Sequence, residues 1–345
     1  MKIDADIEQQ FDHVRRIVGE HRFALGVQIV EGVCDPIAVA GGYARVAEAA
    51  VRTVADAAIA AFEVAHGSVP GGELVILALG RMGGAELTHA SDLDLIFLFT
   101  GDFATESSGP RSLGGTLYFN RLSQRVIAGL SVATAAGPLY EVDTRLRPSG
   151  TQGPLAVSFD AFAKYQSEEA WTWEHMALTR ARCIYGSDAA RSTLDAIIAD
   201  TLDRNRDLAT LRGDAIRMRS DMAAHKPPKS SLDVKLLPGG LVDLEFSVHV
   251  TQLAHRTGFD PHLGHAIAAL SKSGLLPTAI SDAYRLMTRL LVVLRLVAPD
   301  LAVPDAATCA LIARACDMPD WSSLLDRLAT VRQEVSEIWS QVAES

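Results

Sequence analysis

Strand-like sequence in this chain is confined to residues 74–158, and the patterns on either side of that stretch are helical. Residues 74–79 are a continuous apolar run, which is typical of a strand buried on both faces. Further strand candidates cover residues 92–99, 139–147 and 154–158, with a helix expected over about 115–133. The sequence therefore predicts an α+β fold, in which a small mixed sheet is surrounded by a largely helical chain.

The domain organisation follows from where these patterns change. Apolar residues recur every three or four positions from residue 4 to about residue 66, and residues 67–72 (GSVPGG) end that periodicity. After residue 159 the chain is helical almost to its end, and a further boundary is expected near residues 257–262. We therefore expect a helical leader at 1–68, a small α/β unit at 69–160, a helical extension at 161–257 and a C-terminal helical bundle at 258–345.

Charge and hydropathy exclude several classes of protein. The 32 Lys and Arg residues are outnumbered by 42 Asp and Glu residues, so no overall basic field is available to hold a nucleic acid. The most apolar helix candidate, at 290–301, is interrupted by Arg295 and is too short to span a bilayer. No apolar signal core follows Met1. We therefore expect a soluble, cytoplasmic protein that binds neither nucleic acid nor membrane.

Cysteine and histidine residues show no spacing that indicates a metal site. The cysteines form no C-x-x-C pair and are expected to be reduced core residues: Cys34, Cys183, Cys309 and Cys316. The ten histidines show no zinc-binding spacing, so we assign no metal to them.

Two aspartates mark the start of the second strand candidate. Successive strand side chains face opposite sides, so Asp92 and Asp94 share one face, roughly 7 Å apart, while Leu93 and Leu95 point into the core. Carboxylates this close repel each other unless a divalent cation lies between them, and their oxygens suit Mg²⁺ or Mn²⁺. A lone D-x-D motif also occurs on many strand ends that bind nothing, so this metal-site hypothesis needs support elsewhere in the chain.

The third strand candidate supplies that support. Alternation along residues 140–147 places four charged side chains on one face: Glu141, Asp143, Arg145 and Arg147. A third carboxylate beside two permanently charged guanidiniums suits metal-assisted phosphoryl or nucleotidyl transfer, because that reaction must neutralise charge on the transferred group. Upstream of the D-x-D motif, Gly83 and Gly84 would let backbone N–H groups approach phosphate oxygens.

These segments together resemble the glutamine synthetase adenylyltransferase family, whose members carry a DNA polymerase β-like nucleotidyltransferase fold. The resemblance covers roughly residues 70–255. It rests on residues 79–87 (LGRMGGAEL), 91–97 (SDLDLIF), 140–150 (YEVDTRLRPSG), 171–182 (WTWEHMALTRAR) and 233–246 (DVKLLPGGLVDLEF). The resemblance implies that residues 69–160 form a nucleotidyltransferase palm. It also implies that the helical extension at 161–257 completes the half of the family's structure that carries the active site.

The resemblance also implies roles for individual residues, with ATP as the substrate. Three carboxylates would be catalytic and hold Mg²⁺ or Mn²⁺: Asp92, Asp94 and Asp143. Three residues would meet the nucleotide phosphates: Gly83, Gly84 and Ser91. Three basic residues would bind the nucleotide with them: Arg145, Arg147 and Lys235. Arg81 stands where the family commonly has Lys, and Pro238 precedes a second glycine pair.

Other charged residues match family positions without a clear role. Asp243 and Glu245 are two apart on the helix expected after Gly240, so they point in different directions and are not both expected to reach the metal. Glu174 and Arg182 are expected roughly along one face of a helix. There they would either contribute to the active site or form part of a structural row of ion pairs.

Family members join two related halves, one that adds AMP from ATP to a tyrosine of glutamine synthetase and one that removes it by phosphorolysis. This chain holds one half, and residues 165–175 resemble the adenylylating one. We therefore expect adenylylation of glutamine synthetase, which regulates nitrogen assimilation, with that enzyme as partner and a signalling protein as a candidate regulator. Three alternatives stay open: phosphorolytic deadenylylation, uridylylation of a signalling protein, and a non-catalytic module that binds nucleotide or glutamine synthetase.

Overall fold

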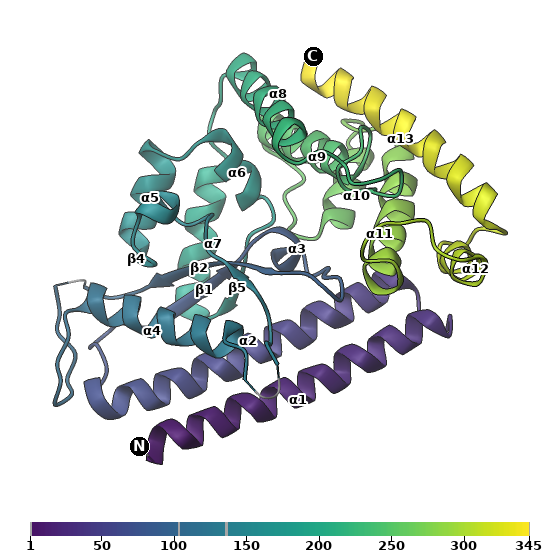
Figure 1. Ribbon diagram of the computed structural model, residues 1–345. Coiled ribbons are helices and arrows are strands. Elements are labelled where there is room, and N and C mark those ends of the chain that lie inside the picture. Colours follow the sequence, from purple (N-terminus) through teal and green to yellow (C-terminus); the bar gives the residue numbers. More distant parts are fainter. Residues whose placement is uncertain (1, 103, 135–136, 345) are drawn as a thin grey trace.

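The computed structural model describes residues 2–102, 104–134 and 137–344, and it is an α+β protein (Figure 1). The helices are α1 (Lys2–Val30), α2 (Pro36–His66), α3 (Gly80–Gly83), α4 (Gly115–Ser131), α5 (Phe159–Glu168), α6 (Thr172–Leu178), α7 (Asp188–Leu202), α8 (Leu208–His225), α9 (Leu241–His255), α10 (Leu263–Lys272), α11 (Ala279–Val297), α12 (Ala306–Ala315) and α13 (Trp321–Glu344). The strands are β1 (Leu74–Ala78), β2 (Leu93–Phe99), β3 (Val142–Asp143), β4 (Ala156–Ser158) and β5 (Arg182–Tyr185). A 3-10 turn, η1, spans Gly150–Gln152.

The sheet is small and mixed, as the sequence predicted. Its order is β3-β2-β1-β5, and β4 also pairs with β2. β1 is antiparallel to β2 and β5, whereas β3 and β4 are parallel to β2. The prediction of the first two strands and of the helix at 115–133 is confirmed to within a few residues. The third strand is much shorter than the predicted 139–147, because a turn begins directly after Asp143.

One strand contradicts the prediction that the chain is helical after residue 159. β5 pairs with the edge of β1 that faces away from β2. Cys183 and Ile184 are both buried there. A four-residue strand that directly follows a helical pattern has too few residues to show a period of two, which explains why the sequence did not reveal it. β5 thus covers an edge that would otherwise be left unpaired.

The sequences of the two central strands, β1 and β2, are almost continuously apolar because helices cover both faces of the sheet. On one face, Ile76 and Phe97 belong to the core formed with α2 and α4. On the other face, Leu77 and Leu98 belong to a second core with α5 and α7. Parallel and mixed sheets covered in this way have no polar side.

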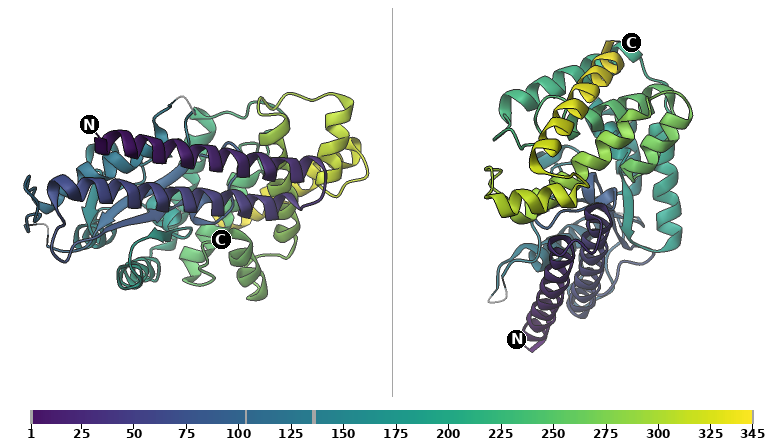
Figure 2. Two further views of the ribbon diagram at one scale, coloured as in Figure 1. Left: turned by 90° about the horizontal axis from the view of Figure 1, so that it is seen from below. Right: turned by 90° about the vertical axis from the view of Figure 1, so that its right-hand side faces the viewer.

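The leader forms a helical hairpin. α1 and α2 lie side by side along the molecule (Figure 2), and α2 packs in turn on α4 and α11. Asp35 caps α2 by accepting a hydrogen bond from the N–H of Ile37 at 2.8 Å, and Pro36 occupies the first turn. Because α2 contacts both the palm and α11, the four parts of the chain share one packed body, and the boundaries predicted between them stay predictions.

Four of the later helices, α8, α10, α11 and α13, pack around α9, which is buried on nearly all sides. Figure 1 shows α8, α10 and α13 beside it. Cys183, Cys309 and Cys316 are buried free thiols, but Cys34 is exposed in the turn after α1, so the prediction that all four cysteines lie in the core is wrong for Cys34. Among the described helices, none combines the length and apolar character needed to cross a membrane.

The buried His249 on α9 should make stability depend on pH. Burial lowers its pKa to about 4, and its Nδ1 lies 2.7 Å from Thr179 Oγ1. Between about pH 6.5 and 4, His249 binds a proton in the unfolded chain but stays neutral in the folded chain. Its contribution should therefore lower the free energy of unfolding by up to ~3 kcal/mol on acidification.

Chemical denaturation of the parent and of His249→Gln across this pH range tests the prediction. The variant should lack this contribution, so its free energy of unfolding should rise relative to that of the parent by up to ~3 kcal/mol between pH 6.5 and 4. His255→Gln, at an exposed position on the same helix, should keep it. An unchanged pH slope in His249→Gln would contradict the assignment.

Candidate active site

Three carboxylates meet where β2 and β3 begin to pair. Asp94 lies on β2 directly opposite Asp143 of β3, and Asp92 precedes β2. One oxygen from each of the three lies within 4.8 Å of the others, the only such cluster among the residues that the structure describes. The N–H of Leu93 donates to the carbonyl of Glu141 at 2.9 Å, which fixes the two strands in this register.

Burial and mutual repulsion set the protonation of these groups. Burial, followed by the charges of Asp92 and Asp143, raises the pKa of Asp94 to about 6. Asp143 behaves in the opposite way, because hydrogen bonds from Arg145 lower its pKa. The Nε of Arg145 donates to Asp143 Oδ2 at 2.8 Å, while 70% of the Arg145 side chain remains exposed. Arg145 thus lies at the cluster, as predicted.

The cluster fits a hard divalent cation. Its donors are all carboxylate oxygens, which Mg²⁺ and Mn²⁺ prefer, and their repulsion is of the kind that a cation relieves. Gly80, at a positive φ of 55°, makes room for the group: a Cβ there would lie 2.5 Å from Asp94 Oδ2. A side chain at position 80 would therefore force this carboxylate to move, and it would also strain the backbone at this positive φ.

A cavity of about 600 Å³ opens beside Asp92, and we call it the cationic cavity. Basic side chains from four parts of the chain line it: Arg22 of α1, Arg81 of α3, Lys235 of the loop before α9 and Arg295 of α11. Ser91, Tyr140 and Glu141 also line it. The ammonium of Lys235 lies close enough to Asp94 and Glu245 to lower the pKa of both. The predicted residues Ser91 and Lys235 are thus brought to one cavity.

Arg81 was not among the predicted site residues. Its Nε and Nη2 atoms are buried and have no hydrogen-bond partner among the described residues, and burial lowers its pKa. The hydroxyl of Tyr140, a residue only 7% exposed, is likewise without a partner. Buried polar atoms are rarely left unpaired, so both are candidates to meet a ligand in the cationic cavity. The sequence offered one indication: an arginine two residues after the apolar run at 74–79.

Gly83 and Gly84 are packed inside the protein. The N–H of Gly83 donates to Leu79 at 2.8 Å, and that of Gly84 donates to Gly80 at 3.1 Å. A Cβ at Gly83 would lie 1.8 Å from the carbonyl oxygen of Arg180, and one at Gly84 would lie 2.4 Å from its Nη2. The structure therefore gives this pair a close-packing role against Arg180, and its contact with phosphate stays a prediction.

Ser91 and Arg147 both bond to their own loops. Ser91 Oγ accepts a hydrogen bond from the N–H of Thr88 at 2.9 Å. Arg147 Nη1 donates to the carbonyl of Thr144 at 2.9 Å and to its hydroxyl at 3.0 Å. Because β3 ends at Asp143, the predicted alternation that would align Arg147 with Asp143 does not extend to residue 147.

The remaining charged family positions serve separate contacts. Asp243 pairs with Arg219 and accepts from the N–H of Gly239 at 2.6 Å. Glu245 pairs with Arg180 at 2.9 Å. Burial opposes ionisation of Glu245, but Arg180 and Lys235 outweigh it and lower its pKa. As predicted, the two carboxylates point different ways, and neither belongs to the cluster of three.

Glu174 and Arg182 do not share a helix face, which corrects the prediction. α6 ends at Leu178, and Arg182 lies on β5, where it pairs with Glu48 at 2.7 Å. Glu174 instead accepts hydrogen bonds from the N–H of Trp171 and the hydroxyl of Tyr165, both at 2.9 Å. It therefore caps the start of α6.

Comparison with known proteins adds family relationships to this geometry. A family model described as glutamate-ammonia ligase adenylyltransferase matches residues 1–197, and one described as GlnD PII-uridylyltransferase matches residues 214–343. Three similar relatives carry the name bifunctional glutamine synthetase adenylyltransferase/adenylyl-removing enzyme. The one from Rhizobium meliloti is 39% identical over 94% of this chain, that from Agrobacterium fabrum 38% over 98%, and that from Brucella suis 44% over 72%.

These relatives are much longer than the chain described here. The matched regions cover 34%, 36% and 25% of their respective lengths. The chain therefore spans at most about a third of the relatives that it matches.

Removing a charge from the cluster should stabilise the metal-free protein and abolish its response to metal. Asp94→Asn removes a carboxylate whose ionisation is opposed by burial and by the charges of Asp92 and Asp143, so the free energy of unfolding at pH 7.5 should rise by ~1 kcal/mol. Mg²⁺ with ATP should raise the thermal midpoint of the parent but not of the variant. Asp160→Asn, an exposed acid on α5, is the control. Equal Mg²⁺ stabilisation of Asp94→Asn and the parent would remove the basis for a metal site here.

Replacing each of the two arginines after β3 should change the free energy of unfolding by different amounts. Arg147→Ala removes two hydrogen bonds to Thr144 and should cost ~1–2 kcal/mol. Arg145→Ala changes a largely exposed side chain and should leave the free energy of unfolding nearly unchanged. Urea denaturation of both variants measures this, and a stable Arg147→Ala would show that the side chain is free for another partner.

Proposed function

Because the chain belongs to the glutamate-ammonia ligase adenylyltransferase family, we propose that it transfers AMP from ATP to a tyrosine of glutamine synthetase. The observation that carries the proposal is the cluster of Asp92, Asp94 and Asp143 beside the cationic cavity. A nucleotidyl transfer needs cation-binding carboxylates and a cationic surface for the triphosphate at one place. Regulation by a signalling protein would extend the proposal and has no assigned site.

In this proposal the three carboxylates hold Mg²⁺ or Mn²⁺. The ion would supply positive charge to the phosphoryl group as it is transferred. Lys235, Ser91 and Arg81 would contact the phosphates in the cationic cavity, and Arg145 would move from Asp143 to the nucleotide. Gly83, Gly84 and Arg147 would act by shaping the loops around this site.

The proposed step exchanges a phosphoanhydride bond of ATP for a phosphate ester bond to the tyrosine. The phenolic oxygen of the acceptor tyrosine attacks the α-phosphorus of ATP, and a new O–P bond forms. The bond from the α-phosphorus to the oxygen that bridges it to the β-phosphate breaks, pyrophosphate leaves and the phenol proton passes to water. Lys235 and Arg81 would stabilise the charge that develops on pyrophosphate. Both residues line the same cavity as Asp92, which supports this role.

The reverse assignment remains the strongest competitor. In phosphorolysis, inorganic phosphate would attack the adenylylated tyrosine, release ADP and restore the phenol, with the same carboxylates and cations. The relatives' names include both activities. A second competitor is uridylyl transfer, which the match of residues 214–343 to a uridylyltransferase model favours. That match lies outside the segment that supplies the three carboxylates, so it bears on the helical part of the chain.

Transfer of labelled AMP to purified glutamine synthetase tests the proposal. The parent should label glutamine synthetase from ATP in the presence of Mg²⁺ and not from UTP. Asp92→Asn and Asp94→Asn should each reduce the rate by about 10³-fold or more, because the cation and its stabilisation of the transition state are lost. Asp160→Asn is the matched control.

Each other outcome selects a different function. Release of ADP from adenylylated glutamine synthetase with added phosphate, without forward transfer, would favour deadenylylation. Labelling of a signalling protein from UTP would favour uridylyl transfer. Near-parent adenylylation by both aspartate variants would contradict the metal assignment.

A further inference from the structure

Helices outside the palm supply part of the positive charge of the cationic cavity. Arg22 comes from α1 and Arg295 from α11, and both line the cavity together with Asp92. We propose that the cavity binds the two terminal phosphates of ATP as one diphosphate group, and that Arg295 makes the protein discriminate ATP from nucleotides that lack them. The inference rests on the proposed function and adds to it a specificity residue on the C-terminal helices.

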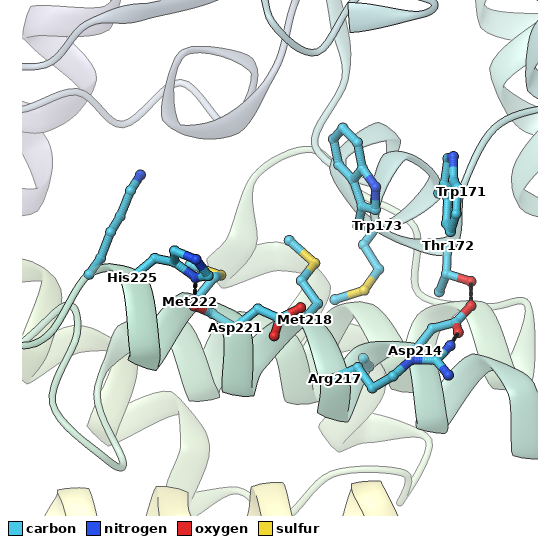
Figure 3. A pocket seen from close by; sticks show the side chains of 12 residues that line it. Trp171, Thr172, Trp173, Asp214, Arg217, Met218, Asp221, Met222 and His225 are labelled. Carbon is cyan, nitrogen blue, oxygen red and sulfur yellow. Dashed lines mark hydrogen bonds and ion pairs between the residues drawn. The ribbon is translucent and has the colours of Figure 1, made fainter.

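Most basic side chains of this cavity are left without partners. Arg81, Lys235 and Arg295 make no hydrogen bond or ion pair with any residue that the structure describes. In another hollow, the groove between α6 and α8, the arginine is instead paired: Figure 3 shows Arg217 bonded to Asp214. Cations that gather around one cavity without partners repel one another, and an anionic ligand relieves that repulsion.

A buried hydroxyl adds a neutral donor to the same cavity. Tyr140 lines the cavity and is only 7% exposed, and its hydroxyl has no partner among the described residues. The guanidinium of Arg22 lies over the Tyr140 ring, 5.3 Å from its centroid, and donates to the carbonyl of Leu139 at 3.3 Å. Each phosphate oxygen accepts more than one hydrogen bond, so a diphosphate suits a site that offers both guanidiniums and a hydroxyl.

The cavity is continuous with the proposed reaction centre. Asp92 belongs to the cluster of three carboxylates and also lines the cavity, as does Ser91 next to it. With the α-phosphorus of ATP at the carboxylates, the neighbouring cavity receives either the other two phosphates or the adenosine. Adenosine carries no charge and would leave the unpaired cations without a partner, whereas a diphosphate pairs with them. The cavity therefore suits the phosphates better.

A buried hydrogen bond fixes α11 at the edge of this cavity. The hydroxyl of Tyr284 on α11 donates to Glu86, and the two residues are only 5% and 1% exposed. Glu86 lies on the loop that leads to Asp92. Leu291 follows Tyr284 by seven positions and Arg295 follows by four more, a spacing that places all three on one face of the helix. The contact that holds Tyr284 on the loop therefore also holds Arg295 at the cavity.

Calorimetry with the full chain, in the absence of glutamine synthetase, tests the inference. Inorganic pyrophosphate, ATP, AMP and inorganic phosphate serve as separate probes, each with Mg²⁺. The parent should bind pyrophosphate and ATP at least tenfold more tightly than phosphate and AMP. Arg295→Gln should weaken the binding of pyrophosphate and of ATP about tenfold, because a charged hydrogen bond is lost, and should leave the affinity for AMP unchanged.

Two further variants control for charge and for position. Arg285→Gln removes the same charge from an exposed position on α11 that does not line the cavity, and it should behave as the parent. Arg295→Lys keeps a positive charge and should recover part of the affinity for pyrophosphate. Thermal midpoints without ligand establish that each variant is folded.

The outcomes separate this inference from the proposed function. Pyrophosphate binding that depends on Arg295 supports the inference even if the parent transfers no AMP. Equal losses of pyrophosphate and AMP affinity in Arg295→Gln would overturn it, as would a parent that binds phosphate as tightly as pyrophosphate. Unchanged pyrophosphate affinity in Arg295→Gln would overturn it as well, and AMP transfer by that variant would still leave the proposed function intact.

Discussion

The repulsion between three carboxylates is the constraint on which the rest of the site depends. The parallel pairing of β2 and β3 places Asp94 directly opposite Asp143, so the sheet holds like charges together that would separate in a flexible loop. Burial makes this more costly, as the raised pKa of Asp94 shows. Basic side chains of the surrounding protein partly neutralise this charge, including Arg145, which donates to Asp143, and Lys235, which lies near Asp94. A bound metal ion would complete this neutralisation.

The cations come from distant parts of the sequence, which links the site to the whole fold. Arg22 lies on the first helix and donates to the carbonyl of Leu139 at 3.3 Å, next to the strand that carries Asp143. Arg295 lies on α11, which packs against α2. The cationic cavity therefore forms only when leader, palm and C-terminal helices are packed together. A ligand that draws these side chains toward one point would stabilise that packing in turn.

Local sequence predicted the parts of the site that depend on one strand. The alternation of Asp92 and Asp94 against buried Leu93 and Leu95 needs only the pleat of a strand, and the structure has it. Alternation also placed Arg147 on the face of Asp143. That prediction fails because β3 ends at Asp143, and the strand alternation does not continue through the turn that follows. The alternation of side chains along a strand does not show at which residue its hydrogen bonding to the neighbouring strand ends. That residue depends on the neighbouring strand and on the turn that follows.

Contacts between distant segments escaped prediction for a different reason. Arg81 is one residue in an apolar stretch. Only in the folded protein does it line a cavity together with Asp92, and this makes its unpaired nitrogens candidates to bind a ligand. Gly83 and Gly84 show the converse. A glycine pair near a D-x-D motif suggests phosphate binding, yet the packed Arg180 occupies the space that the missing side chains leave. Because Arg180 also pairs with Glu245 of α9, the close approach that the glycines permit links the palm to the helix that follows Lys235.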